Sequence, residues 1–136
     1  NRVRMIVASF LVKHLRIHWI EGEKHFKNCL VDYNEASNVA QWQWVAGCGA
    51  DAAPYFRIFN PILQGEKFDK DGAYTKKWVP ELLNMPNKFL YKPWVLEKKY
   101  QEQIKVIIGT DYPRPMVDHA TARNAALEAF QKIKKN

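Results

Sequence analysis

Cysteine is scarce in this 136-residue sequence, which has two of them, Cys29 and Cys48. Their spacing matches no metal-binding motif and nothing indicates an oxidising compartment, so we expect two buried free thiols and no disulfide. The glycine-rich phosphate cradles GxxxxGK[ST] and GxGxxG are also absent. Nucleotide binding by those two routes is therefore unsupported.

Long hydrophobic runs are missing as well. The best candidate for a membrane span, residues 5–17, is interrupted by Lys13 and Arg16 and followed by His18, whereas a span needs about 18 apolar residues. No charged stretch leads into an apolar core with a small-residue cleavage site, which would indicate export. We therefore expect a soluble, cytoplasmic protein without a membrane partner.

A metal site is not expected either. His14 and His18 are four residues apart, a spacing seen in zinc-binding helices. The glutamate of an HExxH arrangement is absent, however, and no third ligand is evident.

What the sequence does have is an apolar content of 47%, enough to bury the core of one domain, and a formal charge of +7. A basic excess of this size is compatible with a polyanionic partner, and it also fits ordinary solubility charge. The chain begins Asn-Arg-Val-Arg-Met with helical periodicity already running. We therefore interpret residues 1–136 as a fragment of a longer protein.

The hydrophobic pattern predicts an all-α fold, because no convincing strand pattern occurs. Cap residues and glycines support helices in the first third of the chain, and prolines and glycines between residues 48 and 72 predict a long ordered loop. The helices expected on this basis cover residues 3–17, 20–30, 36–46, 74–83, 93–103 and 117–135.

The segment 34–44 carries the most informative pattern. Asn34, Asn38 and Trp42 recur at intervals of four, which places two amides and an indole on one helix stripe. Such a stripe suits a planar heteroaromatic ligand held beside a redox-active indole. Trp44 is rotated by about 200° from Trp42, so it should face another side. The alternative is that both indoles are core anchors.

A second pattern lies at the start of the chain. Asn1 and Met5 share one helix face, with Arg2 and Arg4 on either side of it. An amide beside a thioether could line a cavity for a nucleobase. A surface arginine pair and a core methionine would produce the same pattern.

Several motifs together resemble the DNA photolyase and cryptochrome family. They are NRVRMIVASFLVKHLRIHW, DYNEASN, QWQW, DAAPYFRIFNP and QGEKFD, in that order and at the family's spacing. The resemblance runs over residues 1–136 and implies the C-terminal half of the helical FAD-binding domain. The antenna domain and the first part of the helical domain would be absent, so no antenna chromophore can be assigned.

The resemblance also implies roles for particular residues. Arg4 and Asp32 would form a charge pair beside FAD, with Tyr33, Asn34 and Asn38 against its ring and ribose edges. Trp42 and Trp19 would pass electrons to the flavin. The flipped pyrimidine dimer and the DNA strand would be contacted by Asn1, Arg2, Met5, Trp44, Gln64 and Lys67.

The implied function is light-driven repair of cyclobutane pyrimidine dimers in DNA by electron transfer from excited, reduced FAD, in an enzyme that is monomeric at full length. Asn1 and Met5 stand where a (6-4) photolyase typically has histidines, which disfavours that class. Asn34 departs from the family's usual Asp and removes a negative charge near the flavin. A blue-light photoreceptor of the cryptochrome type is the alternative, and a non-catalytic helical DNA-binding module is a third possibility.

Overall fold

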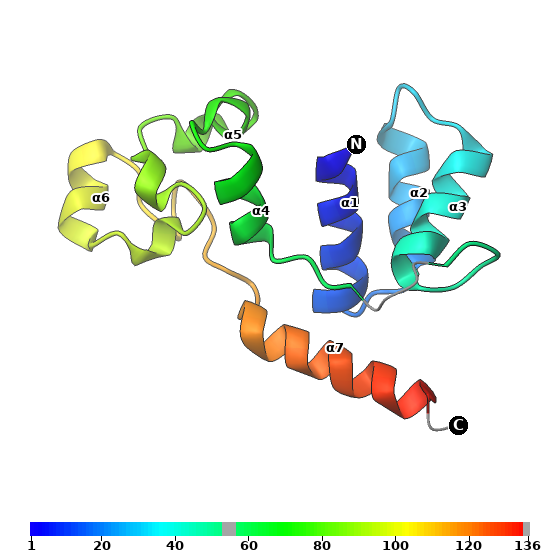
Figure 1. Cartoon of the computed structure of the whole chain (residues 1–136). Coiled ribbons are helices and arrows are strands. Elements are labelled where there is room, and N and C mark those ends of the chain that lie inside the picture. Colours follow the sequence, from blue (N-terminus) through cyan, green and yellow to red (C-terminus); the bar gives the residue numbers. More distant parts are fainter. Residues whose placement is uncertain (53–56, 135–136) are drawn as a thin grey trace. The chain divides into compact units, whose positions relative to one another are not determined.

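A computed structural model describes residues 1–52 and 57–134, and within these ranges the chain is helical without a strand. The all-α prediction is thus confirmed. The chain divides into two compact units, Asn1–Phe59 with Val117–Asn136, and Asn60–Met116 (Figure 1). Over the described residues, no helix is both long and apolar enough to cross a membrane.

Within its described residues, 1–52, 57–59 and 117–134, the first unit contains four α-helices and one π-helical turn. The helix α1 (Arg2–Ser9) runs directly into the π turn η1 (Phe10–His14), α2 (Trp19–Cys29) packs against α3 (Glu35–Ala46), and α7 (His119–Lys134) packs against η1 (Figure 1). The predicted helix 3–17 therefore ends at His14. Arg16, with φ of 55°, lies in the left-handed region beyond it.

The ends of α3 follow the signals in the sequence. Asn34 Oδ1 accepts a hydrogen bond from the Ser37 backbone N–H at 2.9 Å, which is an N-cap. Gly47 ends the helix with φ of 80°, a conformation that costs glycine little because it has no Cβ.

The core of this unit collects around one tryptophan. Trp42 is 2% exposed, and Phe26 meets it edge to face with ring centroids 5.0 Å apart. The other buried members are Ala8 and Val45, and Leu11, Val12, Trp19 and Trp44 pack against them.

The second unit contains the helices α4 (Pro61–Phe68), α5 (Ala73–Trp78) and α6 (Lys98–Ile104), with short 3₁₀ turns between α5 and α6. Gln101 is buried and ties this unit together, because its amide donates to the Leu96 carbonyl and accepts from the Ile108 N–H. The buried core residues are Leu82, Met85, Leu90, Leu96, Val106 and Ile108.

Several predictions need correction. The helix expected over 74–83 ends at Trp78, before a separate 3₁₀ turn that starts at Pro80. The helix expected over 93–103 is a 3₁₀ turn, Pro93–Val95, followed by extended Leu96 and then α6.

The loop expected at 48–72 contains α4, because Asn60 Oδ1 caps the N–H groups of Ile62 and Leu63 and Pro61 occupies the first helical position. Residues 53–56 of that loop lie outside the described residues. The thiols expected to be buried are both exposed, since Cys29 ends α2 on its outer side and Cys48 follows α3.

Candidate functional site

A cavity of about 380 Å³ opens in the first unit among residues of α1, α2, α3 and the turn between α2 and α3. The apolar residues of its lining are Met5, Ala8, Phe26, Leu30, Trp42 and Val45. The polar residues are Asn1, Arg4, Asp32, Asn34, Ser37, Asn38 and Gln41.

The charged side chains in the cavity lining, Arg4 and Asp32, form an ion pair. Arg4 Nη2 lies 2.8 Å from Asp32 Oδ1 and 3.0 Å from Oδ2, so the pair expected from the family resemblance is present. The hydrogen bond from Arg4 lowers the pKa of the Asp32 carboxyl, and the arginine's charge adds to this effect. Both side chains are largely exposed, so the pair contributes orientation more than stability.

The two asparagines predicted to share a helix stripe, Asn34 and Asn38, make different hydrogen bonds. Asn34 Oδ1 is used by the N-cap of α3, so Asn34 lines the cavity as part of the helix start. Asn38 Nδ2 lies one turn further along and donates to the Glu23 carboxylate at 3.1 Å and to the Glu23 backbone carbonyl at 3.2 Å. The stripe is therefore anchored to α2 at its second amide.

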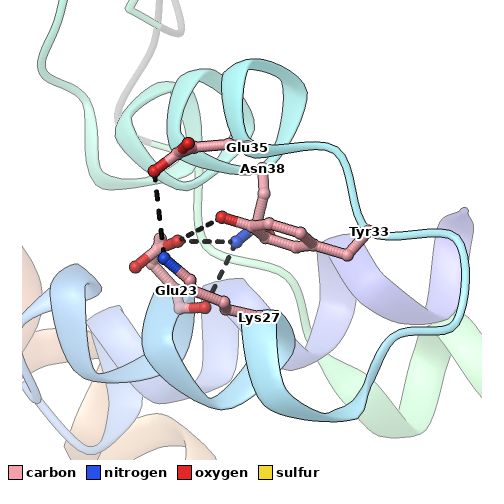
Figure 2. A network of polar contacts seen from close by, with 5 residues as sticks. All are labelled: Glu23, Lys27, Tyr33, Glu35 and Asn38. Atoms are coloured by element: carbon pink, nitrogen blue, oxygen red, sulfur yellow. Dashed lines mark hydrogen bonds and ion pairs between the residues drawn. The ribbon is translucent and has the colours of Figure 1, made fainter.

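Tyr33 joins the same carboxylate (Figure 2). Its hydroxyl donates to Glu23 Oε1 at 3.3 Å, and Lys27 and Glu35 form an ion pair beside it with Nζ and Oε1 3.9 Å apart. Burial raises the pKa of the Tyr33 hydroxyl, and the charges of Glu23 and Glu35 raise it further. Tyr33 thus remains a hydrogen-bond donor at neutral pH.

The three predicted tryptophans lie around one core. Trp42 lines the cavity, whereas Trp19 and Trp44 are half-buried and pack against the cluster that contains it. Trp19 thus lies against the cluster that contains Trp42. Trp44, expected to face another side than Trp42, is not among the residues that line this cavity.

The structure brings only some of the predicted residues together. Asn1, Arg4, Met5, Asp32, Asn34, Asn38 and Trp42 line one cavity, and Arg2 precedes two of them on α1. Gln64 and Lys67 lie on α4 in the other unit, where Lys67 Nζ is 5.3 Å from the Phe68 ring centroid. No metal-binding group of three or more His, Cys, Asp or Glu occurs in the described part of the chain.

Sequence reasoning missed several residues of the site. Phe26 on α2 and Leu30, its C-cap, are four residues apart and both line the cavity, although the sequence predicts only a helix for them. Ser37 and Gln41 repeat the same spacing on α3 and could have been found by extending the amide stripe by one position. Glu23 left no signal, because its role depends on a contact between two helices.

This lining fits a planar heteroaromatic ring with polar edges. Aromatic and aliphatic side chains offer faces for the ring, the amides and Ser37 offer hydrogen bonds to its edge, and Arg4 with Asp32 offers charge. The family described as the FAD binding domain of DNA photolyase matches residues 1–132. This chain belongs to that family.

Individual photolyase-family relatives cover nearly all of the chain. It is 58% identical over 135 residues to the deoxyribodipyrimidine photo-lyase of Agrobacterium fabrum. The aligned region covers 99% of this chain and 28% of that protein. The structure of a class III photolyase from Agrobacterium tumefaciens superposes with a TM-score of 0.93 at 57% identity, over 100% of this chain and 28% of that one.

A cryptochrome has the same fold. The structure of the Synechocystis cryptochrome matches with a TM-score of 0.87 at 41% identity, over 94% of this chain and 26% of its own. The chain spans a little over a quarter of the length of curated relatives such as those of Agrobacterium fabrum and Alkalihalophilus pseudofirmus. The cavity lined by residues of α1, α2 and α3 lies within residues 1–132, which the family model matches.

Proposed function

We propose that this chain is the C-terminal part of the FAD-binding domain, residues 1–136, of an enzyme that repairs cyclobutane pyrimidine dimers in DNA with light. The observation that carries the proposal is the cavity with the Arg4–Asp32 ion pair and Asn38, in a chain of the photolyase FAD-binding family. The relatives named deoxyribodipyrimidine photo-lyase support the reaction type.

In this proposal the residues at the cavity hold the cofactor. Arg4 and Asp32 would hold its polar edge, and Tyr33, Asn34 and Asn38 would lie against its ring and ribose edges. Phe26 and Leu30 keep water away from the ring. Reduced FAD, when bound and excited, supplies the electron that opens the cyclobutane ring and takes it back afterwards; the protein contributes geometry and electrostatics.

Trp42 and Trp19 would carry electrons toward the flavin before repair begins. The support is their shared hydrophobic cluster, in which Trp42 is 2% exposed and also lines the cavity. An indole in such surroundings is held in one orientation and shielded from solvent, which suits electron transfer. Neither residue is needed for the ring-opening step itself.

Binding of the lesion would use Asn1, Arg2, Met5 and Trp44, with Gln64 and Lys67 on the DNA strand. Photolyases are among the enzymes that flip their target nucleotide out of the duplex, and a damaged base costs less to flip than a paired one. Trp44 would offer a stacking face. The formal charge of +7 supports a polyanionic partner, and the whole enzyme would act as a cytoplasmic monomer.

The test is repair by the protein that contains this chain. Purified protein with chemically reduced FAD is illuminated with an oligonucleotide carrying a single thymine dimer, and the undamaged product is quantified. The proposal expects light-dependent restoration and none in the dark. Binding of FAD without light-dependent restoration would contradict it.

The second candidate is a blue-light photoreceptor, which the similarity to the Synechocystis cryptochrome supports. A receptor of this kind would bind FAD and be photoreduced through the same tryptophans. It would leave the thymine dimer intact in the same assay, so one experiment separates the two functions.

A further inference from the structure

The ring of Tyr91 packs against the helix α4 at its glycine. A Cβ atom on Gly65 would lie 2.3 Å from Cδ1 and 2.4 Å from Cε1 of the Tyr91 ring. Glycine is unfavourable inside a helix, because it has no side chain to pack and loses the most backbone freedom on folding. Its presence within α4 therefore has a packing reason, which is to let the Tyr91 ring reach the helix backbone.

The hydroxyl of Tyr91 holds the end of the same helix. Its Oη atom lies 2.7 Å from Oδ2 and 2.5 Å from the backbone oxygen of Asp69, the C-cap residue of α4. Burial raises the pKa of Tyr91 to about 12, and the Asp69 carboxylate contributes to the increase. The hydroxyl therefore keeps its proton and donates to Asp69 at neutral pH. The neighbouring Lys92 adds an ion pair to Glu66 of α4, with Nζ and Oε1 3.1 Å apart.

The helix α4 is short and depends on contacts from outside it. It has eight residues, none of them buried, and isolated helices of this length are marginal in water. Asn60 caps its first turn, whereas Tyr91 contacts its middle and its end. Gln64 and Lys67 lie three residues apart on α4 and so share a side. Lys67 is rotated by about 200° from Gly65, which places it on the far side of the helix from Tyr91.

We propose that Tyr91 is a positioning residue for DNA binding, which holds one side of α4 so that the opposite side presents Gln64 and Lys67 together to the DNA strand. The inference rests on the proposed function, in which these two side chains contact the strand. An ammonium group and an amide can both donate hydrogen bonds to phosphate oxygens. A long side chain loses less freedom on binding when the helix that carries it is already fixed. Tyr91 thus acts through α4 and does not itself touch the DNA.

The test measures binding of a duplex with one thymine dimer to the full-length flavoprotein. We expect Tyr91→Leu to weaken binding about three- to tenfold, within the usual range of couplings between contacting residues. In a protein that already carries Gln64→Ala and Lys67→Ala, the same substitution should weaken binding less than about twofold, because the side chains that it positions are gone. Tyr100→Leu is the matched control, since Tyr100 is 51% exposed on α6 in the same unit.

The dependence of binding on salt distinguishes positioning from general destabilisation. Each lysine–phosphate contact contributes about 0.9 to the slope of log K against log salt concentration. Lys67→Ala should reduce the magnitude of this slope by about that amount, and Tyr91→Leu should change it in the same direction. A smaller folded fraction would lower the affinity at every salt concentration without changing the slope. Additive losses in the combined variant, or an unchanged slope in Tyr91→Leu, would overturn the inference.

A milder variant keeps the test decisive if Tyr91→Leu does not fold. Tyr91→Phe keeps the ring against Gly65 and removes the hydrogen bond to Asp69. We expect it to weaken binding about two- to threefold, at the lower end of what one hydrogen bond contributes. Its control is Tyr100→Phe. Equal affinities for these two variants would overturn the inference in the same way.

Hydrogen exchange without DNA separates this inference from the proposed function. The backbone N–H of Asp69 donates to the Gly65 carbonyl at 2.9 Å, at the end of α4 that Tyr91 contacts. Tyr91→Leu should make the amides of residues 64–69 exchange at least about threefold faster and leave those of α6 unchanged. If DNA binding did not depend on the two α4 side chains, the proposed strand contact would fail, while faster exchange would still show that Tyr91 holds α4. Unchanged exchange in Tyr91→Leu would contradict the positioning role.

Discussion

Gly22 on α2 lies directly against the indole of Trp42, so that a Cβ atom at residue 22 would come within 2.1 Å of Trp42 Cη2. The indole is 2% exposed and also touches Phe26, so it cannot move aside freely. The absence of a side chain at residue 22 therefore determines how closely α2 and α3 approach at the wall of the cavity.

We predict that Gly22→Ala destabilises the protein by about 1–3 kcal/mol, the usual cost of overpacking. The substitution would otherwise gain about 1 kcal/mol from the higher helix propensity of alanine. Chemical denaturation measures the difference. Adding Trp42→Phe removes the clashing atoms, so the double variant should lose less than the sum of the two single losses. Strict additivity would show that the contact has no energetic consequence.

Trp42→Phe in the full-length protein should block light-driven reduction of oxidised FAD. Repair should be retained when FAD is reduced chemically beforehand, because the ring-opening step does not need the indole. Absorbance under illumination and product formation report the two activities. Trp78→Phe is the control, since Trp78 is exposed on α5 in the other unit. Equal loss of both activities would assign Trp42 a packing role alone.

Trp44→Ala should weaken binding of dimer-containing DNA by about 1–3 kcal/mol, the value of a base–aromatic stack, and leave FAD content nearly unchanged. Titrations of damaged and undamaged duplexes at one fixed salt concentration measure this, because salt alone changes the phosphate-driven background. An equal loss for both duplexes, or loss of flavin, would remove Trp44 from the dimer site.

Asp69 should make the second unit sensitive to acid. Its carboxylate accepts hydrogen bonds from Tyr91 at 2.7 Å and Thr75 Oγ1 at 2.7 Å, and it caps α5 through the Tyr74 and Thr75 N–H groups. Burial alone would raise the pKa of Asp69, but these hydrogen bonds outweigh it and lower the pKa to about 2.

A depressed carboxyl pKa stabilises the fold above the unfolded pKa, near 4, and the stabilisation is lost as pH falls toward 2. Asp69→Ala should therefore cost about 2–3 kcal/mol at pH 7, the sum of a lost cap and lost bonds to a charged group. The difference in unfolding free energy between the wild type and Asp69→Ala should become smaller between pH 4 and pH 2. Asp71→Ala, an exposed neighbour, is the control, and a disadvantage independent of pH would contradict the assignment.

His14 should give the first unit a pH dependence near neutrality. His14 is 5% exposed, and its Nε2 lies 2.8 Å from Nδ1 of His119 at the start of α7. Burial lowers the pKa of His14, and the charge of His119 lowers it further, against a bond with the Ser9 backbone. The unfolded chain thus takes up the proton first, so stability falls as pH drops below about 6.5.

Denaturation midpoints at pH 7.5 and 5.5 should differ in the wild type and differ less in His14→Leu. His25→Gln is the matched control, because His25 is exposed on α2. If the denaturation midpoints of His14→Leu at pH 7.5 and 5.5 differed as much as those of the wild type, a group other than His14 would cause the pH dependence.

Much of the first unit follows from local sequence signals. The caps at Asn34 and Gly47 determine α3 to within a residue, and helical periodicity determines α2. Prediction failed where two local signals competed. Pro61 and Gly65 indicate a loop, but Pro61 is the first residue of α4. Gly65 lies within this helix, where the absence of a Cβ atom allows the Tyr91 ring to pack against it. A proline at a first helical position and one in a loop look alike until the cap beside it is known.

By itself, the sequence determined the helical class and the family, because these depend on periodicity and on motifs that lie in single segments. The ion pair Arg4–Asp32, 28 residues apart, was expected only from the family resemblance. Only the tertiary structure decided which groups meet across helices. Glu23 receives Asn38 from 15 residues away, and His14 receives His119 from 105 residues away. Helical spacing determines neighbours three and four residues apart, whereas contacts between helices depend on which faces pack, and the small volume of Gly22 beside Trp42 contributes to that choice.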